Sequence, residues 1–296
     1  MLKKSELVVK SNDLIRASYT LGLVEQRLIL MAIVTARETG LGITADTLLE
    51  IRAMDYAQLF SVTKQAAYMA LSSAIETLFN RRATVQVYDE RRKTLRSLTV
   101  RWVTAMDYEE SMGLITLRFG HEVVPEITRL EANFTSYELE QVAGLKSAYA
   151  IRLYELLIQW RAAGKTPFLK IDEFRSQLGL ADGEYPRMEA FKRCVLDLTV
   201  SQINEHTDIT VSYEQHKAGR IITGFTFSLK QKKHPKDVSP KVKPKSKTTK
   251  NTNENGIDAL LKNNDWVSKH AKAGESWDDA RSRLKNEAET GKFTLT

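Results

Sequence analysis

Residues 171–229 read IDEFRSQLGLADGEYPRMEAFKRCVLDLTVSQINEHTDITVSYEQHKAGRIITGFTFSL. The first residues predict a short helix from about Asp172 to Gly179, because a carboxylate can cap free backbone amides and glycine adopts the left-handed conformation that closes a helix. After a turn at 181–184, residues 185–207 predict a longer helix. The apolar stripe of this longer helix is Met188, Phe191, Val195 and Leu198. A short helix, a turn and a longer helix form a helix-turn-helix.

The residues after the longer helix predict a β-hairpin. Apolar and polar residues alternate over 209–213 and again over 225–229, which is typical of two half-buried strands. The loop between them carries Lys217 and Arg220 beside the turn residue Gly219. A helix-turn-helix followed by such a basic hairpin, or wing, is a winged helix, a module that usually lies on duplex DNA. A winged helix that docks proteins has the same pattern, but basic residues in both helix and wing favour DNA.

Candidate DNA contacts lie in the first half of the longer helix, where a recognition helix makes its base and phosphate contacts. Basic residues crowd this half, and Glu189 and Arg193 fall on the side opposite the apolar stripe. We expect the DNA-contacting residues of this domain to be Tyr185, Arg187, Glu189, Lys192 and Arg193 in the helix, and Lys217 and Arg220 in the wing.

Residues 12–119 predict the same order of elements. A helix over 64–81 leaves Lys64, Gln65 and Tyr68 on its outer side, and two strands after it enclose a charged tip. That tip is the most basic spot of the folded chain, and its cations are Arg91, Arg92, Lys93 and Arg96. These residues, with Lys64, Gln65 and Tyr68, are candidate DNA contacts. The fold class is therefore α+β, with two tandem winged-helix domains and a mostly disordered basic C-terminal tail.

The spacing of Leu14, Leu21 and Leu28 by seven residues raises the possibility of a dimerising leucine zipper. Gly22 lies inside that register and the repeat fails at Thr35, whereas a coiled coil needs several heptads. The pattern favours packing of the three leucines in the core.

The domain organisation follows from these patterns and from a change in composition after Lys230. Between Lys230 and Lys250, nine lysines against one aspartate give a charge of +8, which leaves about −1 of the total of +7 for the rest of the chain. This stretch is too poor in apolar residues to fold. We expect an N-terminal arm at 1–11, a first winged-helix domain at 12–130 for dimerisation and auxiliary DNA contact, a second at 131–230 for the main readout, a Lys/Pro-rich disordered linker at 231–255, and a weakly helical region of unknown role at 256–296.

Composition and motifs argue against several classes of protein. No apolar run reaches the roughly 20 residues that span a bilayer, and the first residues lack a signal-peptide core, so a cytoplasmic protein with no membrane partner is expected. Gly164-Lys165-Thr166 lacks the earlier glycine of a phosphate-binding loop. The five histidines form no zinc or nickase pattern, and the single cysteine, Cys194, allows no internal disulfide. We expect no metal, no cofactor and no enzymatic activity.

Three segments together resemble a known family. They are Ser11-Asn-Asp-Leu-Ile15 with Ala17-Ser-Tyr-Thr-Leu21 and Glu25-Gln-Arg-Leu-Ile-Leu30; Ser147-Ala-Tyr-Ala-Ile-Arg-Leu-Tyr-Glu-Leu-Leu157; and Tyr185-Pro-Arg-Met-Glu-Ala-Phe-Lys-Arg193, continuing to Thr207. They occur in the same order in theta-type plasmid replication initiators of the RepE-like Rep family, and the resemblance covers about residues 8–229. Arg187, Lys192 and Arg193 match basic positions of that family's recognition segment, whereas Cys194 stands where some members have a further arginine.

The resemblance implies a function. Family members bind repeated origin sites, called iterons, as monomers through two winged helices, and they recruit host replication proteins such as helicase, with chaperones as further partners. Dimers joined through the first domain repress the initiator's own gene at an operator inverted repeat. The alternative is a dimeric winged-helix transcriptional repressor with no initiator role. Two non-identical winged helices favour the initiator, because a dimeric repressor needs only one DNA-binding module per subunit.

Overall fold

The computed structural model describes residues 6–44, 46–89, 91–128, 133–232 and 281–286. The chain divides into two compact units, Met1–Lys236 and Asp237–Thr296. In the second unit the described residues 281–286 are helical. The linker predicted at 231–255, apart from its first two residues, and the rest of the C-terminal region lie outside the described residues. Gln231, predicted to begin the linker, still pairs with Ile209 at the end of the last strand.

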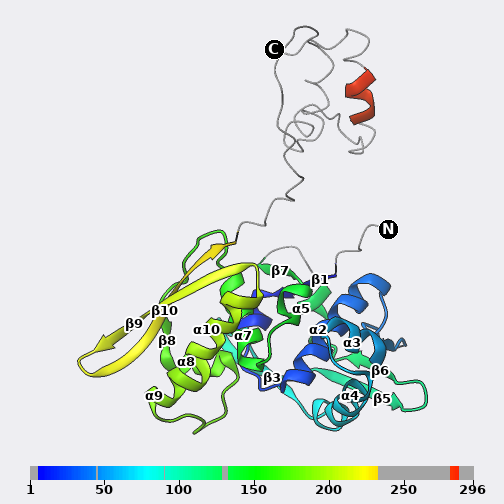
Figure 1. Ribbon diagram of the computed structural model, residues 1–296, viewed down its shortest axis with the longest axis horizontal. Helices are drawn as coiled ribbons and strands as arrows, with labels where there is room; N and C mark the ends of the chain where they lie inside the picture. The colour runs from blue at the N-terminus through cyan, green and yellow to red at the C-terminus, as the bar shows by residue number, and fades with distance from the viewer. Residues whose placement is uncertain (1–5, 45, 90, 129–132, 233–280, 287–296) are drawn as a thin grey trace, which may run out of the picture. The chain divides into compact units, whose positions relative to one another are not determined.

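The first unit contains both winged helices (Figure 1). The elements of the N-terminal part are β1 (Leu7–Ser11), α1 (Asn12–Arg16), α2 (Leu23–Thr39), β2 (Leu49–Arg52), α3 (Ala53–Leu59), α4 (Lys64–Leu78), β3 (Arg82–Asp89), β4 (Thr94–Arg101), β5 (Val103–Glu109), β6 (Leu114–Phe119) and α5 (Val124–Thr128). Those of the C-terminal part are β7 (Phe134–Glu138), α6 (Glu140–Ala143), α7 (Ala148–Ile158), β8 (Leu169–Lys170), α8 (Ile171–Leu178), α9 (Met188–Phe191), η1 (Lys192–Leu196), α10 (Asp197–His206), β9 (Ile209–Ala218) and β10 (Ile221–Gln231).

The C-terminal winged helix consists of α7, the pair α8 and α9–η1–α10, and a sheet with strand order β8-β10-β9. Helix α8 ends at Gly179, whose φ of +85° closes the helix as expected. No side chain caps its other end, so Asp172 lies in the first turn and is not the cap that the sequence suggested. The core joins helices to wing through edge and tilted ring contacts among Phe174, Phe191, Phe225 and Phe227.

The recognition helix departs from the predicted register in its middle. Residues 192–196 form a π turn, in which backbone bonds span five residues and one extra residue enters the turn. The buried stripe therefore runs through Phe191 and Val195 and then continues, shifted by one position, at Leu196, Thr199 and Ile203. The prediction that Leu198 faces the core is wrong, since its side chain is 48% exposed.

The N-terminal winged helix packs α2, α3 and α4 with a sheet of order β2-β6-β5, and β3 and β4 form a separate hairpin. The predicted tip at Arg91–Lys93 is confirmed, and Lys93 takes a left-handed φ of +54°. The return strand ends before Trp102, which is fully buried at the bend into β5, a strand that the sequence analysis did not predict. The fold is thus α+β with two tandem winged helices.

The N-terminal arm is partly a strand. Residues 7–11 form β1, which pairs antiparallel with β7, and Val8, Val9 and Lys10 are buried. Residues 7–11 are therefore not part of a separate arm, as was predicted for 1–11. Their pairing partner lies far along the chain, and local periodicity carries no signal of such a pairing. Leu14, Leu21 and Leu28 are all buried in the core, which confirms core packing for them.

Within the described part of the chain, every helix is too short or too polar to span a lipid bilayer.

Candidate nucleic-acid interface

The recognition helix begins at Met188, with Arg187 at its N-cap position and Pro186 just before it. Pro186 therefore precedes the helix and does not occupy its first turn. Arg187, Glu189 and Arg193 are exposed, as expected for side chains on the side away from the core. Because the N-terminal half of such a helix reaches base edges in winged and other helix-turn-helix proteins, these three exposed side chains remain candidates for DNA contact.

The turn before this helix is held by Arg175 of α8. Its guanidinium donates to the carbonyl oxygen of Glu184 and, at 3.2 Å, to that of Tyr185, and it lies 4.9 Å from the centre of the Phe191 ring. Tyr149 adds a bond from its hydroxyl to Glu184 Oε1 at 2.7 Å. Tyr185 itself has a left-handed φ of +47°, an uncommon conformation for a bulky residue. It is half-buried, so the structure places this candidate contact in the packing of the turn.

The recognition helix is joined to the wing by two polar contacts. Lys192 Nζ donates to Gln215 Oε1 at 3.1 Å and lies 5.8 Å from the centre of the Tyr213 ring. The Tyr213 hydroxyl donates to Asp197 Oδ1 at 2.5 Å. Partial burial and this bond raise the pKa of Tyr213 above its usual value, so the hydroxyl stays a donor at neutral pH. Helix and wing thus form one continuous surface.

Lys217 and Arg220 are exposed at the tip of the wing, on either side of Gly219, whose φ is +61°. The tip extends beyond the part of β10 that pairs with β8 at Gly224 and Phe225. A Cβ atom on Gly224 would lie 2.1 Å from the Leu169 carbonyl oxygen, so only glycine fits where β8 meets the wing. A bulge between Ile222 and Gly224 locally disrupts the ladder, a feature that bends and twists a strand.

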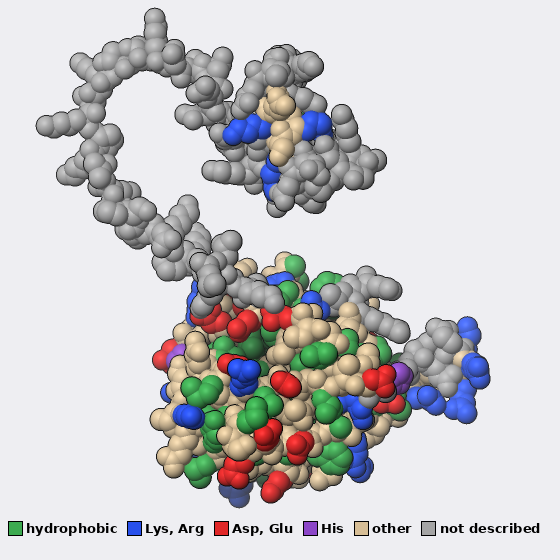
Figure 2. Space-filling view, turned by 90° about the vertical axis from the view of Figure 1, so that its right-hand side faces the viewer, with side chains coloured by type: hydrophobic (Ala, Val, Ile, Leu, Met, Phe, Trp, Pro, Cys, Tyr) green, Lys and Arg blue, Asp and Glu red, His purple; other side chains and the backbone are tan. Residues whose placement is uncertain are grey.

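The candidate residues of the N-terminal winged helix fall into two places. Lys64 and Gln65 are exposed at the start of α4, but Tyr68 is half-buried against Gly113. The exposed cations of the β3–β4 tip are Arg91, Arg92, Lys93 and Arg96. Figure 2 shows Lys and Arg side chains gathered on a projection from the body, whereas charges of both signs are mixed over the main face.

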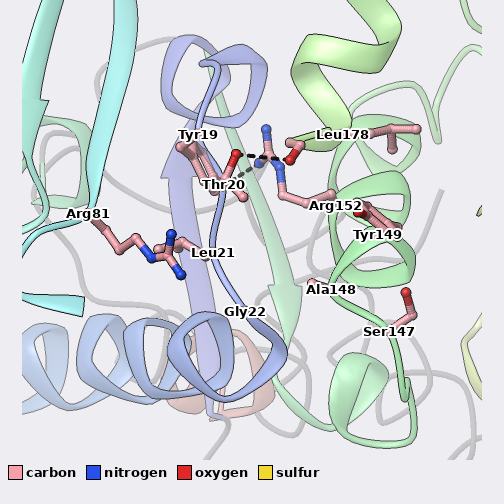
Figure 3. Close-up of a pocket in the computed structure, with 11 residues that line it drawn as sticks. Tyr19, Thr20, Leu21, Gly22, Arg81, Ser147, Ala148, Tyr149, Arg152 and Leu178 are labelled. Atoms are coloured by element: carbon pink, nitrogen blue, oxygen red, sulfur yellow. Dashed lines mark hydrogen bonds between the residues drawn. The ribbon is translucent and has the colours of Figure 1, made fainter. Parts of the chain in front are cut away.

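A cavity of about 260 Å³ lies where residues 19–22 meet α7 and the end of α8 (Figure 3). Both arginines that line the cavity donate hydrogen bonds to other residues of this chain. Arg81 Nε donates to Glu25 at 2.8 Å, and Arg152 donates to the carbonyl oxygens of Ile15, Ala17 and Gln177. The cavity is therefore part of the junction between the two winged helices. Among the described residues no group of three or more His, Cys, Asp or Glu could hold a metal ion.

The residues that connect the recognition helix with the preceding turn and with the wing were not predicted from the sequence. Arg175, Asp197, Tyr213 and Gln215 hold the turn, the helix and the wing together. The strand alternation places Tyr213 and Gln215 on one face of β9, which was the available signal. The partners of Arg175 and Asp197 depend on the packing of separate elements and leave no local pattern.

The fold defines a tandem winged-helix protein in which a helix and a basic wing form one surface in the second module. The chain belongs to the initiator replication protein family: residues 7–158 match the family model described as Initiator Replication protein, WH1, and residues 170–229 match Initiator Rep protein, WH2. The first match extends through α7 and the second covers the helix-turn-helix and wing described above.

Two relatives and a solved structure are similar to this chain. A replication initiation protein of Escherichia coli is 26% identical over 232 residues, which cover 76% of this chain and 70% of the relative. An uncharacterized 27.6 kDa protein of Escherichia coli is 25% identical over 246 residues, covering 79% and 98%. The crystal structure of the Pi initiator protein in complex with iteron DNA superposes with a TM-score of 0.60 at 22% identity, covering 77% of this chain and 98% of the Pi chain, a likeness of fold.

Proposed function

We propose that this protein is a sequence-specific, double-stranded DNA-binding initiator of plasmid replication that binds iterons at the plasmid origin. The observation that carries the proposal is that the recognition helix, which exposes Arg187 and Arg193, is bonded through Lys192 and Gln215 to the wing, whose tip exposes two further cations. Membership of the initiator family supports it, as does the likeness of fold to the Pi initiator protein, which was solved in complex with iteron DNA.

Each candidate residue has a role in this proposal. Arg187 and Arg193 donate to guanine edges, and Glu189 accepts from a cytosine amino group, as these side chains commonly do in the major groove. Lys217 and Arg220 neutralise phosphates beside the groove, as Lys192 does once it leaves Gln215, and Tyr185 shapes the turn that enters it. Auxiliary phosphate contacts come from the N-terminal winged helix through Lys64, Gln65, Tyr68, Arg91, Arg92, Lys93 and Arg96.

The finer features of the proposal concern assembly and partners. Monomers occupy iterons, and dimers joined through the first winged helix repress the initiator's own gene at an inverted repeat. Replication is of the theta type and depends on recruited host proteins such as helicase, with chaperones shifting the monomer–dimer balance. The chain itself catalyses no reaction, and its work is to bind and mark the origin.

A gel-shift titration against the DNA upstream of the protein's own gene tests the proposal. Stepwise complexes, one for each direct repeat and lost when the repeats are scrambled, are expected of an iteron-binding initiator. A single complex confined to an inverted repeat would favour the dimeric repressor. Binding that ignores sequence would overturn both functions.

Variants make the test residue-specific. We expect Arg187→Ala and Arg193→Ala each to weaken binding by about 1–3 kcal/mol and to relax specificity at one base position. Arg37→Ala, in the last turn of α2, is the matched control for loss of one arginine. If both interface variants bind the repeat with wild-type affinity at a fixed salt concentration, the assignment of Arg187 and Arg193 to base contacts is contradicted.

A further inference from the structure

The two most exposed large hydrophobic side chains among the described residues lie one on each wing. Ile221 is 73% exposed on the wing of the C-terminal winged helix, and Leu95 is 69% exposed on that of the N-terminal one. Single exposed aliphatic residues are common on protein surfaces, so exposure alone carries no argument. What the two residues share is their position.

Both residues lie at the start of the return strand of their hairpin, just after a turn with a left-handed residue: Ile221 is the first residue of β10, and Leu95 is the second residue of β4. Ile221 follows Gly219 and Arg220, and it pairs with Ala218 across the hairpin. Leu95 lies two residues after Lys93, whose φ is +54°, and directly precedes Arg96. Each wing therefore presents an aliphatic side chain at its tip, directly beside cationic ones.

Nothing in the packing of the C-terminal hairpin requires an aliphatic residue at 221. Lys217, Ala218 and Arg220 around it are exposed, and the buried side chains of β10 begin only near its pairing with β8, at Phe225. The position therefore contributes little to the core. An aliphatic side chain with cations beside it, at the end of a projecting hairpin, suits a surface that is apolar in its interior and anionic along its rims.

The minor groove of duplex DNA gives access to such a surface, because its rims are phosphates and the stacked bases between which a side chain can insert are apolar. Proteins that enter it place Arg or Lys near its negative potential and insert Leu, Ile, Phe or Met between base pairs, which partly unstacks the step. We propose that Ile221 and Leu95 are minor-groove wedges, each inserted at a base step next to the site that its recognition helix reads. The inference rests on the proposed function and adds to it a second kind of contact, made by apolar side chains rather than by charge.

A fluorescence experiment with the full chain and one origin repeat tests the wedge. Adenines of the repeat are replaced one at a time by 2-aminopurine, whose fluorescence rises when the base unstacks. Wild-type protein should brighten the probe at a step beside the recognition-helix site. Ile221→Ser should abolish the rise at that step, whereas Ile221→Val, which keeps a β-branched apolar side chain, should retain it. Leu95→Ser and Leu95→Met make the same comparison for the other wing.

Affinity and salt dependence separate the wedge from charge. We expect Ile221→Ser to weaken binding about tenfold, because an aliphatic side chain loses its burial, while the salt slope stays at the wild-type value. Arg220→Ala should lower the slope by about one. Ile221→Lys should strengthen attraction to phosphate yet lose the fluorescence rise. Circular dichroism of each variant confirms that the exposed substitution leaves the fold intact.

The outcomes distinguish this inference from the proposed function. If wild-type protein prefers the repeat over scrambled DNA but brightens no probe, or if Ile221→Ser and Leu95→Ser both brighten it as wild type does, the wedges are wrong and the initiator proposal stands. If wild-type protein shows no preference for the repeat, the proposed function and the wedges are overturned together.

Discussion

Lys10 and Glu155 lie 145 positions apart in the chain, yet Lys10 Nζ donates to Glu155 Oε1 at 2.6 Å, with both side chains buried. Arg152 Nη1 lies 3.2 Å from the other carboxylate oxygen, and the Tyr137 hydroxyl donates to Oε1 at 2.6 Å. The single Glu155 carboxylate thus forms ion pairs with two buried cations, Lys10 and Arg152. This cluster joins β1, at the start of the chain, to α7, the buried helix of the C-terminal winged helix.

Removing the carboxylate should therefore cost more than removing the lysine. Glu155→Gln leaves two cations buried without a counter-charge, and we expect a loss of about 3–5 kcal/mol in the free energy of unfolding. Lys10→Met leaves Glu155 paired with Arg152 and should cost less than half as much. Urea unfolding of both single variants and the double variant measures the coupling. Equal losses in the two single variants would contradict this account of the cluster.

Acid should weaken the same contact. Burial alone would raise the pKa of Glu155, but Lys10 and Arg152 outweigh it and hold the pKa below the usual 4.5. A carboxyl group with a lower pKa in the folded state stabilises the fold above its unfolded pKa, and that contribution is lost as the pH falls. The stability difference between wild type and Glu155→Gln should therefore shrink below about pH 4.5. Unfolding titrations from about pH 7 to pH 3 measure it, and a difference that grows in acid would refute the prediction.

Gly179 should be sensitive to a methyl group because of a close approach between the two parts of the fold. A Cβ atom there would lie 2.5 Å from the Tyr19 carbonyl oxygen, and the φ is +85°. Gly183 has a similar φ of +77° but open space around it. Gly183→Ala should cost about 1–2 kcal/mol from backbone conformation alone. Gly179→Ala should lower the free energy of unfolding clearly more in the same thermal unfolding measurement. Equal losses in the two variants would mean that the backbone at Tyr19 moves away from the new methyl group at little energetic cost.

Arg175 should affect DNA affinity without touching DNA. Because its guanidinium holds the Glu184 and Tyr185 carbonyls, Arg175→Lys should loosen the turn that sets the start of the recognition helix. We expect binding to the origin repeat to weaken about tenfold, which corresponds to about 1.4 kcal/mol. The salt slope should keep its wild-type value, since no phosphate contact is removed. A lowered slope would show that Arg175 contacts phosphate directly.

Lys232 should stabilise the far end of the recognition helix. Its ammonium group donates to the carbonyl oxygens of Asn204 and Thr207 at 2.6 and 2.7 Å, where the helix end is negative. Lys232→Met should lower the free energy of unfolding by about 0.5–1 kcal/mol. Lys230→Met, two residues earlier at an exposed position, is the matched control and should have no measurable effect. A similar loss in both variants would point to the basic character of the segment instead.

The candidate DNA-contacting residues of the second winged helix were predictable to the extent that local sequence pattern defines the helix and the hairpin that carry them. The spacing of apolar residues, the glycines and the clustered cations predicted two helix-turn-helix units with basic wings. Helix and hairpin signals act over a few residues, so the positions of Arg187, Arg193, Lys217 and Arg220 followed from the chain alone. The core-facing position predicted for Leu198 was wrong, because the π turn shifts the register of the recognition helix by one residue.

The sequence by itself thus determined the order of elements, the tandem winged-helix class and the basic character of both wing tips, since each depends on residues close together in the chain. Only the tertiary structure decided that β1 pairs with β7, that Lys10 meets Glu155, and that Arg175 holds the recognition turn. These contacts join residues far apart in the chain, and their stability comes from burial and hydrogen bonding that exist only once the elements have packed.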